Sequence, residues 1–280
     1  MRNARKIAAA ALLVCFSAAW GFGHETIHGK GPVVEKKIDA GGVREVVLET
    51  VGTLVIEQGN DEGLTVKAEE NILEHLRFEQ KGDRLVIKTK GRVNLDPNKP
   101  VRYMLEVKRL DRLGLHASGD AVLGDMTTEE FRVEIHGSGD LDGEDLNAAE
   151  VMFDSHGSGD LSFGSIRAES IRITMNGSGD GDFGRIDVKR TDLRLNGSGD
   201  LEIRGGETET LDLELHGSGD CDADGMESGE AEVSINGSGD ASIRADRNVD
   251  ATLSGSGDLH VRGDAKVRSS VHGSGDVRFH

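Results

Sequence analysis

The chain has 280 residues, enough for one or two domains, and carries 33 Lys and Arg against 51 Asp and Glu, a formal charge of −18. A chain this acidic repels phosphate backbones and anionic membrane surfaces, which argues against nucleic acid and lipid partners and leaves cations and basic partners open. Glycine is very frequent, with 39 residues, and proline is scarce, with 3, so the chain is neither collagen-like nor a proline-rich linker.

The N-terminus has the composition of a secretory signal peptide. The stretch "MRNARKIAAAALLVCFSAAWGFG" has a basic start, an apolar run over residues 7–16 and small residues after it. We interpret residues 1–23 as a signal peptide that is cleaved near residues 19–23 and is too short to span a membrane. A lipoprotein signal that acylates Cys15 is disfavoured, because bulky Val14 stands where a small residue is needed. No other segment is apolar enough to span a bilayer, so we expect an exported bacterial protein in the periplasm, at the cell surface or outside the cell.

Residues 24–110 contain strand-like segments without a strict repeat: "REVVLET", "TLVIEQG", "LTVKAEE", "RLVIKTKG" and "VRYMLEV". Turn signals such as Gly59-Asn60 and Gly82-Asp83 separate them, and "NLDPNKP" is the clearest loop. We expect an irregular β lead-in over residues 24–110 that caps the first rung of whatever follows.

Residues 111–280, the repeat array, repeat one phrase nine times, with an Asp closing each turn. Six of the intervals between these aspartates are 20 residues long and the last two are 18 residues long. A fixed period near 20 indicates a solenoid, in which each repeat covers the apolar face of its neighbour. The aspartates are Asp120, Asp140, Asp160, Asp180, Asp200, Asp220, Asp240, Asp258 and Asp276.

Apolar residues fall at offsets +1, +3, +6, +8, +11, +13 and +15 from each turn Asp, as in the repeat after Asp160. This is period-two alternation in three short runs, which predicts three strands and three corners per repeat. The fold class is therefore all-β: a single-stranded parallel β-helix with about nine rungs of ~20 residues marked by GSGD turns. An antiparallel meander is the alternative, since Asn-Gly is a hairpin signal, but repetition in one direction disfavours it. The mature chain has the single thiol of Cys221 and no internal disulfide, so its stability must come from this core.

The GSGD turn needs a sharp bend, so we expect positive φ for at least one glycine in most turns. We expect each Asp to bond the backbone N–H groups of its own turn. The residue before each motif is polar and should form a ladder along the stack. This column is His116, His136, His156, Asn176, Asn196, His216, Asn236, Ser254 and His272.

Three kinds of chemistry were weighed for these columns. A serine hydrolase with Ser138 as nucleophile is disfavoured, because nine copies of a turn are architecture and the Asn repeats lack a base. Zinc or nickel shared by His116, His136 and His156 competes with the interpretation of these histidines as ladder residues. Calcium on the aspartate column competes with solvated turn aspartates, the interpretation we prefer. The candidate calcium ligands are Asp140, Asp160, Asp180, Asp200 and Asp220.

The lead-in "VREVVLETVGTLVIEQGNDEGLTVKAEE", then "DRLVIKT", "LEVKRLDRLGLHASGD" and the Gly-Ser-Gly repeats resemble the bacterial family of putative auto-transporter adhesin head GIN domain proteins. The resemblance covers about residues 34–276 and implies one GIN-like, exported β-helical domain over residues 34–280, with adhesion suggested by the family name. This chain departs from the family in its longer and more regular array.

We therefore expect an exported, non-enzymatic, adhesin-like interaction module of the cell surface or envelope, with no catalytic or cofactor-binding residue. Its partner would be an envelope or extracellular protein or glycan. The alternative is a carbohydrate-active enzyme, a lyase or hydrolase, built on the same helix with clustered carboxylates. The sequence does not indicate an oligomeric state.

Overall fold

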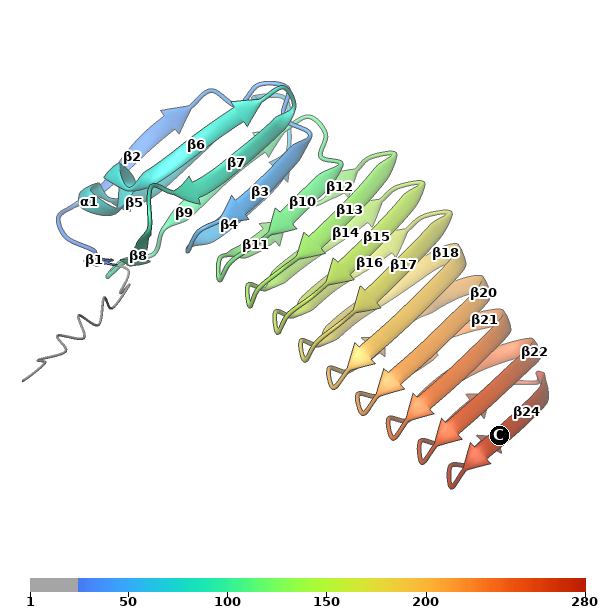
Figure 1. Cartoon of the computed structure of the whole chain (residues 1–280). Coiled ribbons are helices and arrows are strands. Elements are labelled where there is room, and N and C mark those ends of the chain that lie inside the picture. The colour runs from blue at the N-terminus through green and yellow to red at the C-terminus, as the bar shows by residue number, and fades with distance from the viewer. Residues whose placement is uncertain (1–24) are drawn as a thin grey trace, which may run out of the picture.

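The computed structural model describes residues 25–280 and shows an elongated stack of β-strand coils (Figure 1). The predicted signal peptide and Cys15 lie outside the described residues. Residues 25–280 contain one short helix, α1 (Glu70–Glu74), and no helix in this part of the chain is long or apolar enough to cross a membrane.

The strands fall into two sets. The lead-in forms β1 (Glu25–His28), β2 (Val33–Ile38), β3 (Glu45–Glu49), β4 (Thr53–Gln58), β5 (Gly63–Glu69), β6 (Leu76–Lys81), β7 (Arg84–Thr89), β8 (Val93–Asp96) and β9 (Arg102–Val107). The repeat array forms β10 (Arg112–Leu115), β11 (Asp120–Leu123), β12 (Met126–Thr127), β13 (Glu130–Ile135), β14 (Leu141–Asn147), β15 (Glu150–Ser155), β16 (Leu161–Arg167), β17 (Ser170–Met175), β18 (Gly181–Gly197), β19 (Leu201–Ile203), β20 (Gly206–Gly217), β21 (Cys221–Gly237), β22 (Ala241–Gly255), β23 (Leu259–Arg262), β24 (Lys266–Gly273) and β25 (Val277–Phe279).

The lead-in joins the array out of chain order. β3 and β4 pair in parallel with β10 and β11 of the array, and β7 and β9 pair in parallel with the other edges of β3 and β4. Beyond them the direction changes, because β6 runs antiparallel to β7, β5 to β9, and β2 to β5. Antiparallel strands of the lead-in therefore close this end of the stack (Figure 1).

The array is a parallel β-helix, as predicted. Leu141 lies opposite Leu161, a shift of 20 residues, and Ala241 lies opposite Leu259, a shift of 18. Every pairing among β10–β25 is parallel, so the antiparallel alternative is wrong for this region. Equal offsets therefore lie in columns along the stack.

The predicted inward offsets form the core. In the coil after Asp160, Leu161, Phe163, Ile166, Ile171, Ile173 and Met175 are all buried, and Ala168 is half-buried. Gly143 occupies an inward offset without a side chain because the ring of Phe163 fills that space: a Cβ on Gly143 would lie 2.2 Å from Phe163 Cε1. Large and small residues alternate between neighbouring coils, and this alternation fills the interior at native density.

The three predicted runs per coil appear as three straight stretches separated by corners. At Glu144-Asp145, within β14, two successive side chains face outward, which breaks the alternation and marks a corner that the strand passes through. In later coils the strand also continues through the second corner, so that β18 and β21 each span 17 residues.

The prediction about glycine torsions is wrong for most turns. Only four of the nine turns have a glycine with positive φ, at Gly217, Gly237, Gly255 and Gly273. The physical reason for glycine is the closeness of the neighbouring coil. A Cβ on Gly139 would lie 2.1 Å from the carbonyl oxygen of Gly119, and one on Gly157 would lie 1.9 Å from that of Gly137. The turns stack backbone on backbone, with the Ser158 N–H bonded to the Gly137 oxygen at 3.0 Å.

Candidate functional site

A long groove of about 1240 Å³ runs along one side of the stack, from β3 to β24. Its walls are the outward side chains at offsets +10 and +12 of each coil, such as Ser170 and Arg172 on β17 or Thr210 and Asp212 on β20. Its floor is formed by the inward neighbours at +11, among them Ile171 and Leu211. Parallel, in-register pairing produces the groove, because it aligns the same two outward positions from one coil to the next.

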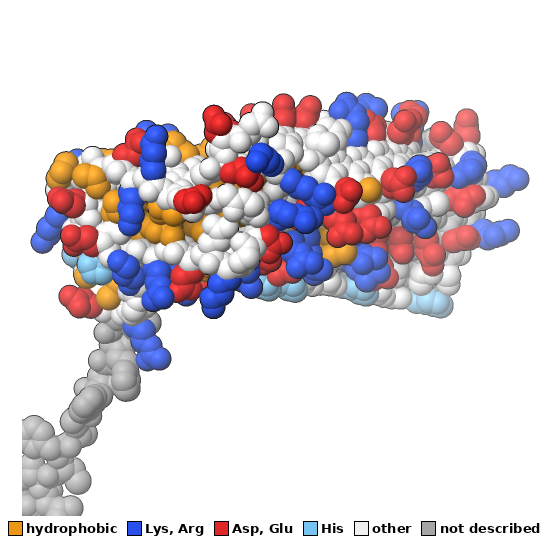
Figure 2. All heavy atoms as spheres, turned by 90° about the horizontal axis from the view of Figure 1, so that it is seen from above, with side chains coloured by type: hydrophobic (Ala, Val, Ile, Leu, Met, Phe, Trp, Pro, Cys, Tyr) orange, Lys and Arg blue, Asp and Glu red, His pale blue; other side chains and the backbone are white. Residues whose placement is uncertain are grey.

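The +12 row of the groove changes the sign of its charge along the stack. In order, the residues of this row are Arg112, Arg132, Met152, Arg172, Asp192, Asp212, Glu232, Asp250 and Arg268. We call Asp192, Asp212, Glu232 and Asp250 the acidic row; with about 4.8 Å between coils, it is about 14 Å long. Figure 2 shows charged side chains of both signs packed along the stack and histidines along one long edge.

The acidic row is only partly neutralised. Asp192 is bonded by Arg172 at 2.8 Å and by Arg194 at 3.0 Å. Within residues 25–280, no ion pair is formed by Asp212 or Glu232. Partial burial and the charges of Asp192, Glu214 and Glu232 raise the pKa of Asp212 above its ordinary value. A row of like charges that the protein does not itself balance attracts cationic groups.

The turn aspartates lie at an edge of the stack and bond between coils. The Asp160 N–H donates to Oδ1 of Asp140 at 2.9 Å, and the Asp180 N–H donates to Oδ1 of Asp160 at 2.8 Å. The same bond repeats up to Asp276, so the expectation that each carboxylate bonds its own turn is wrong. In-register stacking brings the next coil's N–H closer than any N–H of the same turn. Asp140, Asp160, Asp180, Asp200 and Asp220 are exposed, and calcium binding by them stays a prediction.

The column before the turns is a ladder, as expected, for most of its length. The rings of His136 and His156 stack with centroids 5.1 Å apart and planes at 5°, and Asn196 donates to Asn176 at 2.9 Å. Of the three histidines considered for zinc or nickel, the structure groups His116 and His136 with Glu134, whereas His156 is not part of this group. Ser138 is exposed in its turn, where its N–H bonds the Ala117 oxygen at 3.2 Å.

Sequence reasoning missed the groove and Glu134. Both lie at outward offsets, which the search for a core does not inspect. Writing the +12 and +14 residues of each repeat as columns shows the change from Arg to Asp and Glu and the neighbourhood of Glu134 and His136.

The comparisons with known proteins agree on the fold. The family model described as putative auto-transporter adhesin, head GIN domain, matches residues 44–165 and 157–265. A putative adhesin from Parabacteroides distasonis has a similar structure, with a TM-score of 0.70, 21% identity, and coverage of 91% of this chain and 100% of that one. A putative lipid binding protein from the same organism gives 0.69, 22%, 91% and 100%, and a putative adhesin from Parabacteroides merdae gives 0.65, 16%, 91% and 99%. A search of curated proteins finds no match.

Proposed function

This chain belongs to the putative auto-transporter adhesin head GIN domain family, and on that premise we propose that it is an exported, non-enzymatic interaction module of the bacterial envelope. It binds a basic segment of a partner protein along the long groove. The acidic row carries this proposal, since four carboxylates in register are aligned on one wall of a groove.

The charge distribution supports a basic partner. The lead-in, residues 25–110, contains 15 Lys and Arg and 15 Asp and Glu, so it is neutral. The array, residues 111–280, contains 15 Lys and Arg and 36 Asp and Glu. The whole excess of negative charge therefore lies on the array, where it accelerates the approach of cationic partners and selects against anionic ones.

A glycan ligand has less support from the groove. Sugar-binding surfaces favour exposed aromatic rings, and the array phenylalanines Phe131, Phe153, Phe163 and Phe183 are buried. Among residues 25–280, the large hydrophobic side chains that are well exposed are Val33, Val271 and Phe279, which do not line the groove. This arrangement also gives no support to a lipid ligand, the ligand class in the description of one similar structure.

Export is supported by the signal-like N-terminus and by the family. The carbohydrate-active enzyme is tested directly: purified protein incubated with acidic polysaccharides releases no unsaturated or reducing ends above a blank. Sustained release would favour the enzyme.

The binding proposal is tested with two variants of equal charge. Asp212→Asn with Glu232→Gln removes two charges from the groove, and Asp160→Asn with Asp200→Asn removes two charges from the turn edge. Isothermal titration with a Lys- and Arg-rich peptide of about 12 residues should give a Kd about fivefold to tenfold weaker for the groove variant and changed less than twofold for the turn variant. Equal losses in both variants would show attraction to net charge alone and would contradict a groove site.

A further inference from the structure

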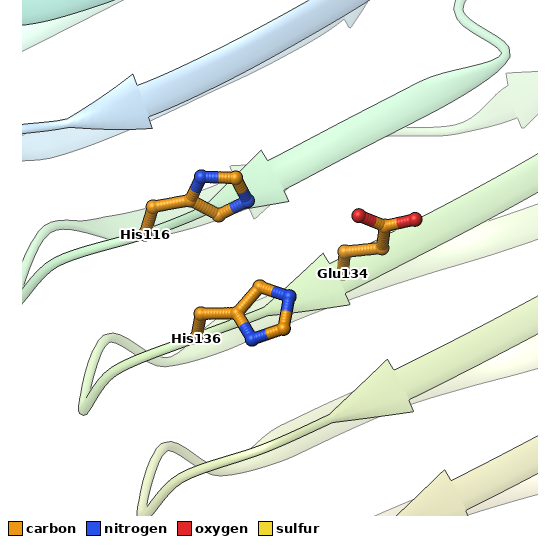
Figure 3. Close-up of side chains that lie close together, drawn as sticks. All are labelled: His116, Glu134 and His136. Carbon is orange, nitrogen blue, oxygen red and sulfur yellow. The ribbon is translucent and has the colours of Figure 1, made fainter.

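Three potential metal ligands from two neighbouring coils converge beside the first turns of the array. His116 follows β10, Glu134 lies in β13 and His136 follows β13, and one ligand atom from each lies within 4.8 Å of the others. Each imidazole ring has a nitrogen on the side that faces the Glu134 carboxylate (Figure 3). Residues 25–280 contain no other group of three such ligands.

The His116 ring has a buried nitrogen without a partner. Its Nε2 is inaccessible to solvent and forms no hydrogen bond, although buried polar atoms in folded proteins are nearly always paired. This nitrogen lies over Gly114, where a Cβ would be only 3.2 Å away. Gly114 is directly opposite Glu134 in the register of β10 and β13, so a missing side chain leaves space beside the carboxylate.

The ladder does not explain the orientation of His116. The rings of His136 and His156 are stacked at 5°, whereas those of His116 and His136, with the same centroid separation of 5.1 Å, meet at 71°. His116 is thus turned out of the stack, and its unpaired nitrogen belongs to the group that contains Glu134.

We infer that His116, Glu134 and His136 form a binding site for a divalent transition-metal ion of the Zn²⁺ type. Two imidazole nitrogens and one carboxylate suit Zn²⁺, Ni²⁺ or Cu²⁺, whereas Ca²⁺ and Mg²⁺ take mainly oxygen ligands. Bonds of about 2.1 Å in a tetrahedron place ligand atoms about 3.4 Å apart, so the side chains need to approach by at most about 1.4 Å. His136 is exposed and can make this adjustment by rotating its side chain.

The surroundings position the carboxylate and leave the metal accessible. Arg132 bonds Oε1 of Glu134 at 2.9 Å and Asp154 at 3.1 Å, so one carboxylate oxygen is held and the other is free to bind the ion. Three protein ligands leave at least one coordination position for water or for a donor from another molecule. A bound ion would link the coil of β10, which adjoins lead-in strand β3, to the next coil of the array.

The test is isothermal titration of Zn²⁺ into the untagged, EDTA-dialysed full chain in buffer that contains 5 mM Mg²⁺ as the competing hard cation (about 5 mM, set by the oxygen preference of Mg²⁺). His116→Gln and His136→Gln remove nitrogen ligands, Glu134→Gln removes the charge, and His156→Gln is the matched control from the same column. Circular dichroism and Tm without metal establish that each variant is folded.

We expect one Zn²⁺ per chain and a rise in Tm on binding, because the ion stabilises the folded state. Each ligand variant should weaken binding at least tenfold, and His156→Gln should change it less than threefold. Failure to saturate at one Zn²⁺ per chain, binding that survives in the His116→Gln/His136→Gln double variant, or an equal loss in His156→Gln would overturn the site.

Discussion

Arg44 donates from Nε to Oδ2 of Asp111 at 2.7 Å, although 67 residues separate them in the chain. The contact connects the segment before lead-in strand β3 to the segment before array strand β10. Asp111 also accepts hydrogen bonds from Arg109 at 2.6 Å and from Thr128 at 2.8 Å. This carboxylate therefore holds the lead-in to the first coils of the array.

The Asp111 contact predicts a pH dependence of stability. Burial alone would raise the pKa of Asp111, but hydrogen bonds from Arg109, Thr128 and Arg44 lower it below 3.8. Because the pKa in the folded state is the lower one, ionised Asp111 stabilises the fold above the unfolded-state pKa, and this contribution is lost as the pH falls through the folded-state pKa.

Asp111→Asn should therefore reduce the free energy of unfolding by about 1–3 kcal/mol at pH 7 and by less at pH 3. Denaturant unfolding at the two pH values measures this. Glu129→Gln is the control, since Glu129 is 80% exposed and bonds only Arg109. A loss that is independent of pH would contradict the assigned role.

A second prediction tests the inward and outward positions on β20. Leu213 is fully buried, and Leu213→Asp should lower the free energy of unfolding by about 3–5 kcal/mol, because it places an unpaired charge in the core. Asp212 faces the groove with a raised pKa, so its ionised form is unfavourable at neutral pH, and Asp212→Asn should be silent or slightly stabilising. Thermal and urea unfolding of both variants measure this, and equal destabilisation would refute the assigned phase.

A third prediction follows from the stacked turns. Gly139→Ala places a Cβ 2.1 Å from the Gly119 oxygen and should cost about 1–3 kcal/mol, because two coils must separate locally. Ser138→Ala in the same turn is the control, since Ser138 is exposed. If unfolding midpoints of the two variants agree within error, backbone closeness is not the reason for glycine.

A fourth prediction concerns the aspartate column. Each carboxylate accepts an N–H from the next coil, and its remaining charge is screened by salt. At matched ionic strength, Ca²⁺ should raise Tm no more than Mg²⁺. If Ca²⁺ stabilises clearly more, and if the Asp160→Asn, Asp180→Asn and Asp200→Asn triple variant removes that excess, the column is a calcium site after all.

The array was predictable because its repeat states the same information nine times. Offsets such as those of Leu161 and Ile171 identify inward positions, and equal spacing implies parallel stacking. The family was also predictable, because the lead-in segments and the turns occur in the family's order, and the family match confirms it.

Two features were beyond the sequence because they depend on distances between coils. The need for glycine at position 139 arises from a carbonyl 20 residues earlier, and turn torsions alone do not reveal it. The joining of β3 to β10 was also hidden, because 62 residues lie between Glu49 and Arg112 and no periodicity connects the two strands. Glu134 and His136 lie within one repeat, but the orientation of His116 toward them depends on packing over Gly114.

Photo-cross-linking in the exporting bacterium tests the central claim, that the groove is the surface by which this protein binds its partner. A photoreactive amino acid replaces Thr210, which is exposed in the groove, or Glu202, which is exposed outside it. We predict adducts with Lys- and Arg-rich segments of an envelope protein from position 210, few from position 202, and loss of the adducts when Asp212→Asn and Glu232→Gln are present. Equal labelling from both positions, or adducts that survive these two substitutions, would contradict it.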